Sequence, residues 1–77
     1  MEEHLSDLLP GQRCVIESMD IYGGLRKRLR DMGFQPQAGV SCALIAPSGS
    51  PMAFWVRDAL VALRREDCKK ITVRHDK

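Results

Sequence analysis

Residues 40–56 read VSCALIAPSGSPMAFWV, and this stretch decides the fold. Two apolar runs that contain β-branched and aromatic residues flank a segment of proline, serine and glycine, residues 47–51, which are typical turn residues. The stretch therefore predicts a β-hairpin with strands at 40–46 and 52–56. Arg57 and Asp58 can close a second, tight hairpin into residues 59–64, although this pair lacks the glycine that two-residue turns prefer.

Alternation along these strands separates a core face from an outer face. If Ala46 pairs with Met52 across the turn, one face carries large apolar side chains and is expected to be core. Its members are Val40, Cys42, Leu44, Met52, Phe54 and Val56. The opposite face would then carry Ala43, Ile45, Ala53 and Trp55, with Leu60 across from Trp55 and Ala62 two residues further along.

This outward stripe carries no charge, and it has two interpretations. An exposed apolar patch with a tryptophan at its centre is typical of a protein-binding surface. Alternatively, a one-residue change of register buries it, or an N-terminal turn covers it with Leu5, Leu8 and Leu9.

One amphipathic helix and several short elements complete the predicted fold. Residues 22–32 place Leu25, Leu29 and Met32 on one side of a helix, and Gly33 suits the left-handed position that follows it. Further elements are expected at 5–9 (one turn capped by Ser6), 13–17 (strand), 66–69 (helical turn) and 71–73 (strand). Such short strands around one helix predict a mainly β fold, a small, strongly bent β-barrel with one inserted amphipathic α-helix and short terminal helical turns.

Length and charge exclude several classes of protein. The 77 residues allow one domain, 1–77 with its core at about 5–74, and exclude an enzyme with a separate substrate domain. A net charge of +2 and only four aromatic residues argue against nucleic-acid binding. Acidic residues after Met1, the lack of an apolar segment of about 20 residues and an odd number of cysteines favour a cytosolic protein.

Residues that could bind metal or catalyse a reaction are scattered. The three cysteines, Cys14, Cys42 and Cys68, are expected to be small buried hydrophobes. Both histidines, His4 and His75, lie in terminal segments that nothing in the sequence fixes, close to Glu2, Glu3 and Asp76. We therefore expect no cofactor, no catalytic set and no firm metal site, although Fe(II) or another divalent metal is left open.

A basic cluster follows from the predicted helix. Arg26, Lys27 and Arg30 point away from its apolar side, and with Arg28 they make up a basic helix face. They form either a solvated face or an electrostatic dock for an acidic protein surface or anionic headgroups.

The sequence resembles the ferrous iron transport protein A (FeoA) family across residues 5–73. The resemblance is carried by four features: Leu5–Gly11, Lys27-Arg28-Leu29 with Met32-Gly33-Phe34, residues 46–51 (APSGSP) and Val61-Ala62-Leu63-Arg64. Two departures are the Pro36-Gln37 pair, where the family usually has Pro-Gly, and Ser50, where it often has Asp. The first departure is expected to reshape a turn, and the second removes an acid from the loop.

The resemblance implies an SH3-like barrel and a function in ferrous iron uptake. It implies a small cytosolic accessory protein at the inner face of the membrane, which contacts FeoB, a transporter with a cytosolic GTPase domain. Trp55, Leu60, Ile45 and Ala43 would be the apolar part of the contact, and Arg26, Lys27 and Arg30 the charged part. The alternatives are a metal-sensing module like the barrel of iron-dependent repressors and a small nucleic-acid-binding barrel, and self-association is also left open.

Overall fold

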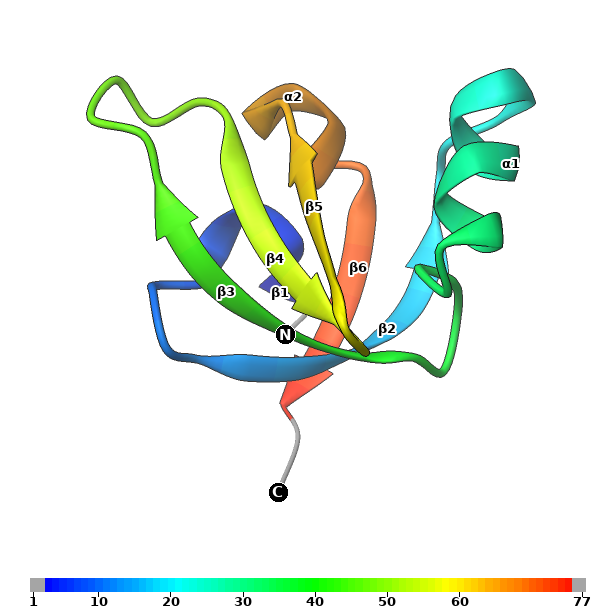
Figure 1. Cartoon of the computed structure of the whole chain (residues 1–77), viewed down its shortest axis with the longest axis horizontal. Helices are drawn as coiled ribbons and strands as arrows, with labels where there is room; N and C mark the ends of the chain where they lie inside the picture. The colour runs from blue at the N-terminus through cyan, green and yellow to red at the C-terminus, as the bar shows by residue number, and fades with distance from the viewer. Residues whose placement is uncertain (1–2, 76–77) are drawn as a thin grey trace.

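The computed structural model describes residues 3–75 and contains six strands, two α-helices and one 3₁₀ turn. In chain order they are β1 (Glu3–His4), η1 (Leu5–Asp7), β2 (Arg13–Met19), α1 (Gly23–Asp31), β3 (Gly39–Ile45), β4 (Met52–Val56), β5 (Ala59–Leu63), α2 (Arg65–Cys68) and β6 (Ile71–His75) (Figure 1). The strands form one antiparallel sheet in the order β1-β6-β2-β3-β4-β5. The mainly β fold with one inserted helix is confirmed.

The sheet bends strongly without closing into a barrel. Its hydrogen-bonded ladder has β1 at one end and β5 at the other, so the expected closure is not made by strand pairing within residues 3–75. In Figure 1, α1 stands on the side of β5 that faces away from β4. The helix thus stands beside the open end of the ladder, with a groove between α1 and β5.

The core lies inside the bend, where Phe34 and Phe54 are fully buried. Their rings meet edge to face with centroids 6.4 Å apart, a geometry that the aromatic quadrupole favours. Phe34 reaches this place because the chain turns after α1 at Gly33, whose φ of +90° matches the predicted left-handed position. All three cysteines are buried and free, as expected, and burial raises the pKa of Cys68 to about 12.

A β-bulge in β3 changes the predicted faces of the first hairpin. Cys42 pairs with Phe54 but Leu44 pairs with Ala53, so Ala43 is an extra residue on β3. Met52 consequently pairs with Ile45, and the predicted pairing with Ala46 is wrong.

The bulge moves three side chains relative to the sequence prediction. Leu44 leaves the core and is 51% exposed. Ile45 packs against the core instead of facing outward, and Ala43 is half-buried in the bulge. The rest of the predicted core face, Val40, Cys42, Met52, Phe54 and Val56, is buried.

The two ends of the described chain pair with each other. Glu3 lies opposite Val73 and His4 opposite Thr72, a pairing that the sequence analysis did not predict. Leu5 and Leu8 are buried, whereas Leu9 is 61% exposed. Ser6 lies inside η1, and the N-cap residue of η1 is His4. The predicted serine cap is therefore wrong.

Candidate functional site

The outer side of the β3-β4-β5 sheet carries an apolar surface centred on Trp55. Ser41, Trp55 and Leu60 form one cross-strand row, and Leu44, Ala53 and Ala62 form the next. The exposed fractions of Trp55 and Leu60 are 48% and 47%. We call Leu44, Ala53, Trp55, Leu60 and Ala62 the outer apolar face.

The second hairpin, formed by β4 and β5, places Trp55 and Leu60 side by side on this surface, as the sequence predicted. Arg57 and Asp58 form its two-residue turn, and Arg57 adopts a φ of +53° in place of a glycine. Trp55 therefore lies directly opposite Leu60. Ala53 is only 6% exposed although it is on the outer face, because its cross-strand neighbours Leu44 and Ala62 flank it.

The one-residue bulge takes Ile45 and Ala43 out of the predicted stripe, but neither this register change nor the N-terminal turn covers Trp55 and Leu60. The bulge brings Leu44 onto the face, and Trp55 stays exposed. The 3₁₀ turn η1 instead packs against α2 and β6. The Arg65 side chain ties it there by donating to the carbonyl oxygens of Ser6 at 3.1 Å and Gly49 at 2.8 Å.

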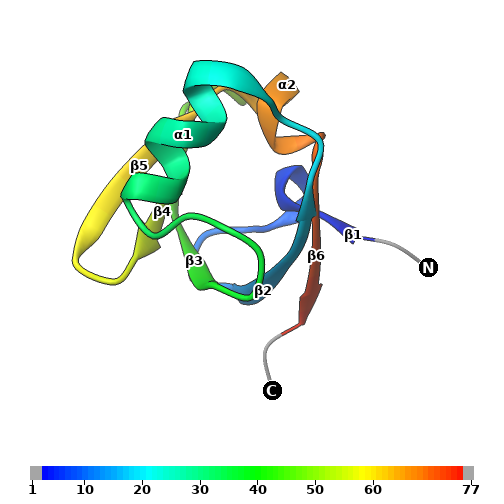
Figure 2. The same cartoon turned by 90° about the vertical axis from the view of Figure 1, so that its right-hand side faces the viewer.

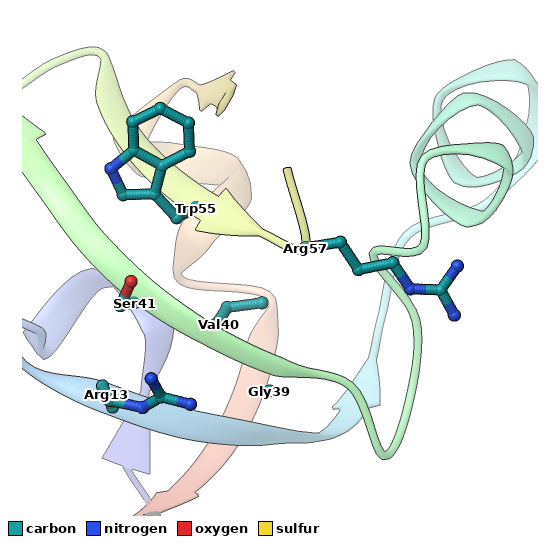
Figure 3. Close-up of a pocket in the computed structure, with 6 residues that line it drawn as sticks. All are labelled: Arg13, Gly39, Val40, Ser41, Trp55 and Arg57. Atoms are coloured by element: carbon teal, nitrogen blue, oxygen red, sulfur yellow. The ribbon is translucent and has the colours of Figure 1, made fainter. Parts of the chain in front are cut away.

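A polar hollow of about 280 Å³ borders Trp55 (Figure 3). Its lining residues are Arg13, Gly39, Val40, Ser41, Trp55 and Arg57. In Figure 3 the Arg57 side chain extends away from Trp55 toward the loop before β3. There it lies over Gly33, where an added Cβ would meet its Nε at 3.4 Å. The two arginines do not converge, so they form a basic margin and not an anion pocket.

An apolar groove of about 280 Å³ runs between α1 and β5. We call it the α1–β5 groove. It is lined by Leu25, Arg28, Leu29, Met32, Leu60, Val61, Ala62 and Leu63. This groove was not predicted from the sequence, although the spacing of the apolar α1 residues and the charge-free sequence of β5 indicate its two walls.

The predicted basic residues of α1 divide into two groups. Arg26 Nη1 donates to the carbonyl oxygens of Met19 at 2.6 Å and Ile21 at 3.2 Å, so this side chain fastens α1 to the end of β2. Lys27 and Arg30 are exposed. They remain accessible to a partner.

The histidines are held in strands, contrary to the expectation that nothing fixes them. His75 Nε2 pairs with a Glu3 carboxylate oxygen beside the β1–β6 ladder. Glu2 and Asp76 lie outside the described residues. Within residues 3–75, no three His, Cys, Asp or Glu side chains gather into a group that could hold a metal ion.

Helices of the described part of the chain are too short and too polar to cross a membrane. The comparison with known proteins identifies the family. Residues 3–75 match the FeoA domain. The chain belongs to the FeoA domain family.

Relatives of known structure support the SH3-like fold. The FeoA protein of Chlorobium tepidum is 30% identical and superposes with a TM-score of 0.89, covering 95% of this chain and 70% of that one. Stenotrophomonas maltophilia FeoA, a prokaryotic SH3-domain protein solved in complex with zinc, is 29% identical with a TM-score of 0.77, covering 94% and 89%. The predicted FeoA resemblance and SH3-like fold are confirmed.

A curated relative joins this domain to a transporter. The Fe(2+) transport protein A/Fe(2+) transporter FeoB fusion protein of Porphyromonas gingivalis is 38% identical over 69 residues. The match covers 90% of this chain and 8% of the fusion protein.

Proposed function

We propose that this FeoA-family chain is an accessory protein of ferrous iron uptake that acts by binding an FeoB-type transporter at the cytosolic face of the membrane. The observation that carries the proposal is the fusion protein, in which a sequence 38% identical to this chain is covalently joined to FeoB. Covalent fusion keeps two partners together at high effective concentration, which suits proteins that work in contact.

The outer apolar face supports this function because it offers a contact surface for a protein. Trp55 and Leu60 lie side by side on adjacent strands and are both about half exposed. Tryptophan at the centre of an apolar patch is the residue most often found to dominate binding energy. Lys27 and Arg30 on α1 supply the charged part of the contact, and Arg26 contributes by fixing the helix.

Docking would act on transport by favouring one conformational state of the transporter. A bound protein shifts such an equilibrium only by the difference between its affinities for the two states. The domain itself needs no catalytic group for this role.

The test measures the affinity of the chain for the full-length FeoB-type transporter in lipid nanodiscs. Trp55 has about 100 Å² of exposed side chain to bury, which corresponds to about 2.5 kcal/mol. We expect Trp55→Ala to weaken binding by at least about tenfold. The matched control is Leu9→Ala, which removes another exposed apolar side chain, outside the outer apolar face, and should leave the affinity unchanged.

Two results would count against the proposal. Equal affinities of Trp55→Ala and the parent protein would remove the outer apolar face from the contact. A transporter that does not bind the parent protein at all would remove the proposed function.

A further inference from the structure

One edge of β5 is open. β5 ends the ladder and pairs with β4 on one side only. In a hairpin with a two-residue turn, the residues that flank the turn form a hydrogen-bonded pair, and the pattern then alternates. Val56 and Ala59 flank this turn, so the backbone N–H and C=O groups of Leu60 and Ala62 point away from β4.

The sequence of β5 lacks the residues that usually protect an edge strand, and although α1 stands beside this edge, the α1–β5 groove separates the two. Backbone hydrogen bonds outside the ladders of residues 3–75 include none from Leu60 or Ala62. The strand has no proline, no charged residue and no bulge between Asp58 and Arg64. Such an edge can accept another strand.

The α1–β5 groove lies along the same edge. It is lined by consecutive residues 60–63, although the Val61 and Leu63 side chains are buried, so β5 presents its backbone edge to the groove. Four residues at about 3.3 Å each give a length of about 13 Å, which suits a short extended segment. Leu25 and Leu29 of α1 and the C-cap residue Met32 form the opposite wall, and Figures 1 and 2 show α1 beside β5.

Charge indicates what kind of segment fits. Arg28 is the one charged side chain among the lining residues, and Lys27 and Arg30 are its neighbours on the same helix. An acidic residue at the end of an apolar segment would be attracted to this wall. A second copy fits less well, because pairing of two β5 edges would bring both α1 helices against the same strands.

We propose that an extended segment of a partner protein, apolar at alternate positions and with an acidic residue at its end, adds to β5 as a further strand in the α1–β5 groove. Backbone hydrogen bonds to Leu60 and Ala62 give affinity, and the apolar wall and Arg28 give specificity. The proposal deepens the proposed function, on which it rests for the identity of the partner, because it names how a transporter segment would be held.

The first experiment uses a model strand and needs no transporter. The probe is the peptide acetyl-Asp-Val-Thr-Val-Thr-Val-Asp-amide, titrated into protein labelled with ¹⁵N and with ¹³C at the methionine methyls, and followed by NMR. We expect saturable shifts and slower hydrogen exchange at the amides of Leu60 and Ala62, with shifts at the Met32 methyl. A matched peptide, N-methylated at alternate residues, should bind at least about tenfold more weakly because it cannot complete the ladder.

Charge variants test the wall of the groove. Arg28→Glu and Lys27→Glu change the charge equally, but only Arg28 lines the groove. We expect Arg28→Glu to weaken binding of the acidic peptide several-fold more than Lys27→Glu. Undisturbed Leu60 and Ala62 amides at millimolar peptide, equal binding of the N-methylated peptide, or equal effects of the two charge variants would overturn the proposal.

The second experiment uses the full-length transporter in nanodiscs. Ala62→Pro removes an edge N–H that β4 does not use, and Ala62→Ser is its matched control. We expect Ala62→Pro to bind the transporter at least about tenfold more weakly than Ala62→Ser. If the NMR spectrum shows that Ala62→Pro does not fold, Arg28→Glu replaces it, and its affinity for the transporter is compared with that of the parent protein.

The outcomes separate the two proposals. A transporter that binds Ala62→Pro and Arg28→Glu as tightly as the parent refutes strand addition and leaves the proposed function standing. Binding of the peptide without binding of the transporter refutes the proposed function and supports the groove. Self-association that Ala62→Pro abolishes, measured by sedimentation, would make a second copy the occupant and overturn the proposal.

Discussion

Arg65 connects three separate segments through one half-buried side chain, and its removal should be costly. Its guanidinium donates to the carbonyl oxygens of Gly49 and Ser6, which lie in the β3–β4 loop and in η1. The backbone N–H of Arg65 donates to Ser50 Oγ at 3.2 Å. Ser50 thereby caps α2, because the N-cap residue Arg64 makes no side-chain hydrogen bond to the helix. The substitution Arg65→Met keeps an apolar stem and the backbone hydrogen bond but removes both side-chain hydrogen bonds.

The magnitude follows from those two bonds. A hydrogen bond from a charged donor contributes about 1.5 kcal/mol in a well-packed site, and partial exposure reduces this, so together the bonds contribute about 2 kcal/mol. A chain of this length has a total stability of about 4–12 kcal/mol, so the loss is a large fraction of it. The expected fall in melting temperature is about 8–16 °C.

The assay is urea unfolding followed by far-ultraviolet circular dichroism, with Arg64→Met as the matched control. Arg64 is exposed and its nearest carboxylate oxygen, on Glu66, lies 3.9 Å away, so its loss should cost less than about 0.5 kcal/mol. If Arg65→Met unfolds within about 0.5 kcal/mol of Arg64→Met, the two bonds contribute nothing net and the reasoning is refuted.

Two further predictions concern stability. Gln37 has a φ of +78°, which glycine adopts without strain. Gln37→Gly should therefore raise the free energy of unfolding in urea by up to about 1 kcal/mol, reduced by the loss of the hydrogen bond that Arg74 donates to the Gln37 side chain. A decrease in the free energy of unfolding would contradict this. Burial raises the pKa of Cys68 to about 12, so the unfolded chain loses this proton first as pH rises. The contribution of the protonated Cys68 thiol to the free energy of unfolding is therefore fully present below about pH 9. The free energy of unfolding should fall by up to about 1.4 kcal/mol per pH unit between about pH 9 and 12. Unfolding curves against pH for the parent and Cys68→Ala measure this, and parallel curves would contradict it.

The second hairpin could be predicted from sequence because its cause is local. A two-residue turn at Arg57 and Asp58 fixes the register, and the alternation of period two then sets Trp55 against Leu60. The buried positions of Phe54 and Val56 follow from the same alternation.

Other features depend on contacts that the local sequence does not encode. The bulge in β3 leaves Ala43 without a partner on β4 and pairs Leu44 with Ala53. Neither alanine nor leucine is a residue type that indicates a bulge, so its position could not be predicted. The bonds from Arg26 to two backbone carbonyls arise only when α1 lies against the end of β2. The expected reshaping at Gln37 also fails, since this residue holds the left-handed turn and donates its N–H to Ile16 at 2.7 Å.

The pairing of β1 with β6 determines how this domain can be joined to other proteins. The two strands are neighbours at one end of the ladder, and β5 forms the other end. Along the ladder, β2, β3 and β4 therefore separate the two terminal strands from the proposed docking edge. A sequence joined to the domain through β1 or β6 can therefore change without altering the strand that forms the proposed docking edge.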